Sequence, residues 1–215
     1  MDIFISVGRT FNKNHEDFVS GLEDYLRANG MNPRAIGRSD FSHKNPLKFI
    51  EDLMKQCDGA IIIAFERLHV SEGIEKRGSE NPIEIKDENI PTAWNQIEAA
   101  MSYALGLPLF VLVERGCRNE GLLEAGYDWY VQRITMSRET LQTKSFVGAF
   151  VNWKNELEQK KSEKKTLPIK QPPDIDKMTL GQFFTSLKLS HLLTLIGLII
   201  GFSALVAKIV TAIVK

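Results

Sequence analysis

The chain has 215 residues, and its 27 Lys and Arg balance its 27 Asp and Glu. A net charge of zero leaves no basic field that would hold a nucleic acid, so we expect no nucleic-acid partner. With 43% hydrophobic and 25% charged residues, the composition is that of a globular protein. Cys57 and Cys117 are too few for a disulfide scaffold, and the four His lack metal-ligand spacing, so we expect no metal. The first residues also lack the pattern of a secretory signal peptide.

Strand and helix patterns alternate through residues 1–157, which we take as one domain. An alternation of this kind predicts a doubly wound, flavodoxin-like α/β sheet of about five mainly parallel strands. In such sheets, ligands bind at the carboxyl ends of the strands, near the point where the strand order reverses. In chain order, the predicted elements are strand 3–7, helix 16–28, strand 32–36, helix 46–56, strand 60–65, helix 91–105, strand 107–113, strand 130–134 and helix 141–157.

The pattern changes after residue 157. Residues 158–177 are charged and contain prolines, which predicts a linker, and the amphipathic residues 178–188 predict a short interfacial helix. Residues 189–207 carry no formal charge and would span roughly 28 Å as a helix, close to the hydrocarbon core of a bilayer. We therefore predict a transmembrane helix over 189–214, the alternative being a buried core helix. The excess of Lys before this span predicts that the N-terminal head faces the cytoplasm.

Polar residues follow the predicted strands. After the first strand, Ser6, Gly8 and Arg9 offer a hydroxyl, backbone N–H groups and a cation to a phosphate, although an ordinary turn is the alternative. The loop does not have the spacing of a dinucleotide-binding or P-loop motif. The polar loop 37–45 contains Arg38 and is predicted to be a flap or an interaction loop. The long charged stretch 66–90 is predicted to be either a lid over the site or a disordered loop.

The helix predicted over 91–105 contains the strongest catalytic candidate. Trp94 and Glu98 are four residues apart, so they lie on one helix face. A carboxylate on an apolar, sheet-facing helix is costly unless it is paired or used, and burial would raise its pKa and suit it to glycosidic chemistry. The alternative is that Glu98 faces solvent. We expect Trp94 to wedge the helix against the sheet.

The same residues resemble those of bacterial TIR and TIR-like domains. The resemblance covers roughly residues 1–150 and includes the opening segment FISVGRTFN and the W-x-x-x-E motif at 94–98. The stretch around Glu98, with Gly106 and Pro108, and the segment around Asp58 are also similar to nucleoside 2-deoxyribosyltransferases. The resemblance implies that Glu98 is catalytic in cleaving the nicotinamide–ribose bond of NAD, which is a substrate and not a cofactor. From the loops and the resemblance together, we predict that the substrate-binding residues are Ser6, Gly8, Arg9, Arg38, Asp58 and Trp94.

A TIR-like head on one membrane span resembles effectors of bacterial antiphage defence. This implies a protein of the inner membrane that hydrolyses NAD or a related nucleotide when its heads form a homo-oligomer. The lipid bilayer, the nucleotide and other copies of the chain would be its partners. Two alternatives remain open: a non-enzymatic head that senses a nucleotide or partner and assembles the membrane segment, and a nucleoside 2-deoxyribosyltransferase.

Overall fold

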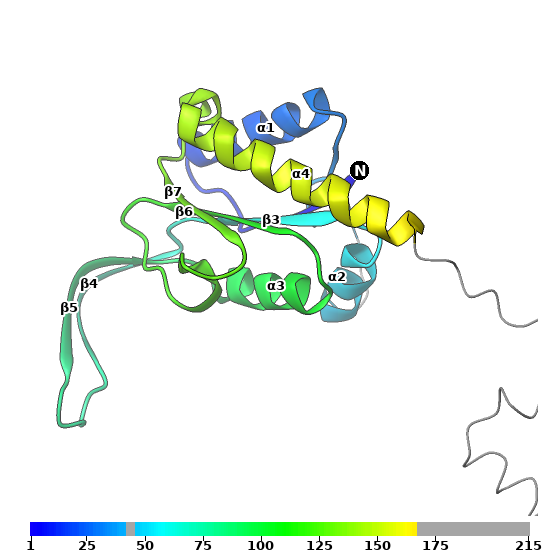
Figure 1. Cartoon of the computed structure of the whole chain (residues 1–215). Helices are drawn as coiled ribbons and strands as arrows, with labels where there is room; N and C mark the ends of the chain where they lie inside the picture. Colours follow the sequence, from blue (N-terminus) through cyan, green and yellow to red (C-terminus); the bar gives the residue numbers. More distant parts are fainter. Residues whose placement is uncertain (42–45, 167–215) are drawn as a thin grey trace, which may run out of the picture. The chain divides into compact units, whose positions relative to one another are not determined.

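The computed structural model describes residues 1–41 and 46–166, with a five-stranded parallel sheet at the centre (Figure 1). The strand order is β2-β1-β3-β6-β7, which is the flavodoxin-like order when only the strands of this sheet are counted. The predicted α/β class with five parallel strands is thereby confirmed. The strands are β1 (Asp2–Val7), β2 (Asn32–Arg34), β3 (Gly59–Ala64), β6 (Leu109–Glu114) and β7 (Tyr130–Ile134); the helices are α1 (Lys13–Ala28), α2 (Pro46–Met54), α3 (Ala93–Ala104) and α4 (Lys144–Thr166), with short 3-10 helices η1 (Gly121–Leu123) and η2 (Arg138–Gln142).

Helices cover both faces of the sheet, α1 and α4 on one face and α2 and α3 on the other (Figure 1). The central strand β3 is buried along its whole length, which explains its continuous apolar sequence GAIIIA. On the α1 and α4 face, Phe110 of the sheet packs with Phe146 and Trp153 of α4. The Trp153 indole N–H donates to the Pro108 carbonyl oxygen at 3.1 Å, so the largest buried side chain is also satisfied in its hydrogen bonding.

Helix α4 continues to Thr166, nine residues beyond the predicted end of the domain. Leu157 is its last buried apolar residue, and side-chain pairs four residues apart, such as Lys160 with Glu156, support the solvated turns that follow. The linker predicted from 158 therefore begins, at the earliest, after this helix. The remaining predicted segments, 167–177, 178–188 and 189–214, lie outside the described residues. Among the residues that are described, no helix is long and apolar enough to cross a membrane.

The stretch 66–90 forms an antiparallel hairpin of β4 (Leu68–Glu75) and β5 (Ile83–Ile90), which projects away from the sheet (Figure 1). The prediction of a disordered loop is therefore wrong, and the hairpin does not fold back as a lid over the sheet. Two contacts hold its base: the Glu66 N–H donates to the Glu114 carboxylate at 2.9 Å, and the Arg118 N–H donates to the Asn89 carbonyl oxygen at 2.7 Å. Its ladder is interrupted at Asp87, whose φ is 51°.

Candidate functional site

The site lies where the order of the parallel strands reverses, between the carboxyl ends of β1 and β3. The chain leaves β1 toward β2 on one side and leaves β3 toward β6 on the other. Ser6 lies next to Ile62 of β3 in the sheet register, and its side chain is only 1% exposed. Helix α3 packs over this point and begins at Thr92, whose side chain caps the helix by accepting from the Trp94 N–H. Flavodoxin-like folds bind ligands at this position.

A buried polar network joins α3 to the sheet at this point. The Asn95 side-chain amide donates to the Ser6 hydroxyl at 3.1 Å and to the Ile63 carbonyl oxygen at 3.2 Å. The Ser6 hydroxyl in turn is a hydrogen-bonding partner of the Glu98 carboxyl group. Asn95 was not among the predicted site residues. The signal for it was available, because position 95 precedes position 98 by three residues and so shares its helix face.

Glu98 lies on the sheet side of α3, so the alternative that it faces solvent is wrong. Burial raises the pKa of its carboxyl group from an ordinary 4.5 to about 7, and the hydrogen bond with Ser6 acts in the opposite direction. No charged side chain among the described residues adds to either effect. The carboxyl group therefore exchanges its proton near neutral pH, which suits both proton transfer and stabilisation of a developing positive charge.

Trp94 does not wedge α3 against the sheet, and that prediction is wrong. The residue lies in the first turn of the helix, and 44% of its surface is exposed. Glu98 is one helical turn further along α3, on the sheet side of the helix. A ring in this position is free to stack on a flat ligand group.

A cleft of about 340 Å³ opens between the loops that follow β1 and β2. Gly8 lies beside Thr92 at the start of α3, where a Cβ would be 3.7 Å from the Thr92 methyl group, an ordinary van der Waals contact. Arg9 lines the cleft, is exposed, and has no hydrogen bond or ion pair with any residue in the described part of the chain. Its guanidinium is therefore available to an anion. The lining residues are Val7, Gly8, Arg9, Thr10, Ile36, Gly37 and Arg38.

Arg38 lines the same cleft, but four hydrogen bonds to side chains of α1 already use most of its donors. Its guanidinium binds the carboxylates of Glu16 at 2.8 Å and Glu23 at 2.7 Å, both on α1. These bonds raise the pKa of Arg38 and lower the pKa of Glu16 to about 2. The structure thus shows Arg38 tying its loop to α1, and its direct contact with substrate stays a prediction.

Asp58 is not brought together with the other predicted site residues. It precedes β3 and therefore lies at the amino edge of the sheet, where its carboxylate accepts from the Asp2 N–H at 3.0 Å and pairs with Lys161 at 3.5 Å. Six strand residues separate it from the carboxyl edge, a distance of roughly 20 Å. Asp58 was predicted as a site residue from its motif alone, without regard to the direction of the strand that follows it.

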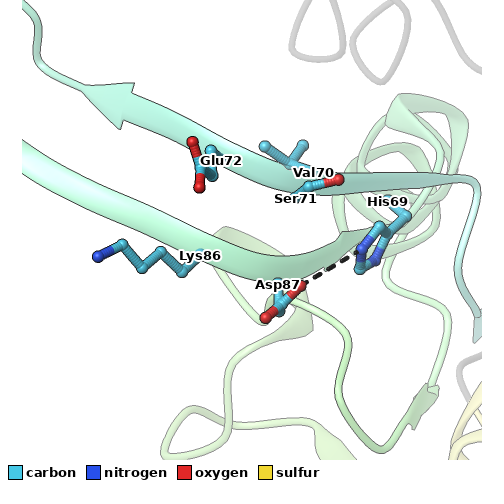
Figure 2. A pocket seen from close by; sticks show the side chains of 6 residues that line it. All are labelled: His69, Val70, Ser71, Glu72, Lys86 and Asp87. Carbon is cyan, nitrogen blue, oxygen red and sulfur yellow. Dashed lines mark ion pairs between the residues drawn. The ribbon is translucent and has the colours of Figure 1, made fainter.

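Two further clusters lie outside the predicted site. Buried His15 binds the Glu114 carboxylate through Nε2 at 3.0 Å and stacks on Phe65 with ring centroids 4.3 Å apart. On the hairpin, Figure 2 shows a shallow pocket of about 610 Å³, in which His69 faces Asp87 at 3.7 Å. Within residues 1–41 and 46–166, no group of three or more His, Cys, Asp or Glu side chains is arranged to hold a metal ion.

Comparisons with known proteins do not identify a family. No family model matches the chain, and no curated protein is similar to it. Among solved structures, the CMP N-glycosidase BcmB of Clostridium botulinum is similar at 16% identity and a TM-score of 0.42, over 68% of this chain and 98% of that one. A similarity this low identifies neither family nor function, so the resemblance to TIR domains stays a hypothesis.

Proposed function

We propose that the head breaks the N-glycosidic bond of NAD or a related nucleotide, with Glu98 facing the sugar. The observation that carries this proposal is the desolvated Glu98 carboxyl group, with its pKa of about 7, next to buried Ser6 where the strand order reverses. As the bond between nitrogen and C1′ breaks, its electron pair leaves with the base and positive charge develops on the ribose. A carboxylate in a site with little water stabilises that charge. Water then adds to C1′ and loses a proton, which gives the free sugar nucleotide.

The cleft beside this site supplies the expected contact with phosphate. Arg9 is a cation there with no partner among residues 1–41 and 46–166, and Ser6 and Gly8 belong to the same strand and loop. The exposed Trp94 ring offers a surface on which a base stacks. These residues bind the parts of the nucleotide that do not react.

Arg9→Ala should raise KM about tenfold and leave kcat within about twofold, because a charge-assisted hydrogen bond to a phosphate acts in the ground state and transition state alike. Steady-state kinetics with NAD measures both constants. Arg77→Ala is a matched control, since Arg77 is an exposed arginine in the hairpin turn. Equal KM values for the two variants would contradict the role of Arg9.

The activity itself is tested by incubating the full-length protein with NAD, NMN, CMP and deoxyribonucleosides, and by following base release by chromatography. The protein is assayed at high density in liposomes and at high dilution in detergent, because we also propose that the heads work as a homo-oligomer and a membrane raises their effective concentration. Base exchange without hydrolysis would assign the chain to the transferase class. No turnover of any substrate under either condition would contradict the proposal.

We further propose that residues 189–214 anchor the chain in the inner membrane with the head in the cytoplasm, on the strength of the uncharged run 189–207. The full-length protein should remain in the membrane pellet after carbonate and high-salt washes. A chain that ends at Thr166, where the compact unit of the head ends, should appear in the supernatant. Release of the full-length protein without detergent would show that it is only peripherally bound.

A further inference from the structure

We propose that Asn95 is a positioning residue, whose side-chain amide directs the Ser6 hydroxyl toward Glu98. This inference rests on the proposed function, because it assigns Asn95 a role in preparing the carboxyl group that would face the sugar. Asn95 itself does not touch the reacting atoms in this account. Its effect passes through one intervening hydroxyl group.

The direction of the hydrogen bonds follows from the chemistry of the partners. The Ile63 carbonyl oxygen can only accept, so the Asn95 atom 3.2 Å from it is the amide nitrogen. The same nitrogen lies 3.1 Å from the Ser6 hydroxyl oxygen and donates its second N–H to that oxygen. Because the Ser6 oxygen accepts from Asn95, its own single proton is free to be donated to the Glu98 carboxyl group, whose pKa Ser6 lowers. The amide thus fixes which way the hydroxyl group points.

Packing alone does not account for an amide at this position. Asn95 is only 1% exposed, and its side-chain oxygen has no hydrogen-bond partner among the described residues. A buried acceptor without a partner is a cost that an apolar side chain would avoid. Ala99, one turn further along α3, fills a comparable buried place without a polar atom. What the amide provides in return is its two donated hydrogen bonds, one of which reaches the site.

Ser6 is the polar group that acts on Glu98. Helix α3 packs against β1, β3, β6, α2 and η1. Two causes shift the pKa of the Glu98 carboxyl group: burial raises it, and the hydrogen bond with Ser6 lowers it. No charged side chain of the described residues on these elements shifts it further. Loss of the Ser6 hydrogen bond therefore leaves burial unopposed, and the carboxyl group becomes harder to ionise.

The decisive variants are Asn95→Leu, Ser6→Ala and the double variant. Leu has nearly the shape of Asn and removes the unpaired oxygen, so the variant should fold. Leu cannot donate a hydrogen bond to the Ser6 hydroxyl group. Each single variant should move the titration of Glu98 to higher pH, and the double variant should move it no further than Ser6→Ala does. Gln96→Ala is the matched control, because it removes a neighbouring amide of α3 that binds the Glu120 carbonyl oxygen and not Ser6.

The titration is measured by carbon NMR of the full-length protein in detergent, with glutamate labelled at its carboxyl carbon and Glu98→Gln used to assign the signal. A Glu98 titration that Asn95→Leu leaves unchanged would overturn the inference, whether or not the protein cleaves a nucleotide. A shifted titration together with an absence of turnover would support the hydrogen-bond chain and contradict the proposed function. In the active protein, the same variants should lower kcat about tenfold below pH 7 and leave KM within about twofold.

Discussion

Glu98→Gln should lower the kcat of nucleotide cleavage at least 100-fold, the loss usual for a group that stabilises charge in the transition state. Gln has nearly the same shape, so α3 and the hydrogen bonds of Asn95 with Ser6 and Ile63 should be kept. What is lost is the negative charge that would face the developing positive charge on the ribose. Nicotinamide release at saturating NAD, at matched protein concentration, measures the effect. Glu158→Gln, which makes the same change on the exposed face of α4, should leave kcat unchanged.

The pH dependence of the wild-type enzyme separates the two roles open to Glu98. If the carboxylate stabilises the sugar cation, kcat rises with pH as Glu98 loses its proton, with a midpoint of about 7. A rate that falls through the same range would instead assign Glu98 as an acid that protonates the leaving base. A Glu98→Gln variant with wild-type kcat would remove Glu98 from the reaction altogether.

The fold was predictable wherever apolar residues are continuous along a strand. Strand β3 and strand β6 are buried on both faces, and their sequences AIII and FVLV predict this directly. The hairpin was missed because exposed strands carry no such signal. Strand β4 has Glu and Ser between its apolar residues, and most of β5 is exposed as well. A charged two-stranded ribbon thus has the composition of a loop.

The site was predictable where its residues lie on one helix or strand. It was not predictable where it depends on the direction of a strand or on contacts between residues far apart in the sequence. The spacing of residues 94 and 98 placed them on one face of α3, but exposure of Trp94 depends on where the helix begins relative to the sheet edge. Asp58 was misplaced because it directly precedes β3 and so lies at the amino end of that strand, a consequence of strand direction that the motif comparison did not use. The pairing of Arg38 with α1 joins residues 15 and 22 positions apart, and no local pattern specifies it.

The free energy of unfolding should respond to Glu98→Gln in the opposite direction from activity. In the folded protein the pKa of Glu98 is about 7, against 4.5 for an ordinary Glu. Below pH 4.5 the carboxyl group is protonated in both states, so the wild type and the variant should be equally stable. As the pH rises from 4.5 to 7, the unfolded chain loses this proton while the folded chain holds it. The wild type is therefore destabilised by up to about 3 kcal/mol, and Gln, which does not titrate, escapes that loss.

Glu98→Gln should accordingly unfold at a temperature several degrees higher than the wild type at pH 8, and at the same temperature at pH 4. Glu16→Gln is the control of opposite sign, because Arg38 lowers the pKa of Glu16 to about 2. That variant should be less stable than the wild type above pH 4.5, and the difference should shrink as the pH falls toward 2. Thermal unfolding across this pH range measures both. A Glu98→Gln variant that is no more stable than the wild type at pH 8 would show that the carboxyl group is well solvated in the folded protein, and the desolvation on which its proposed role depends would be absent.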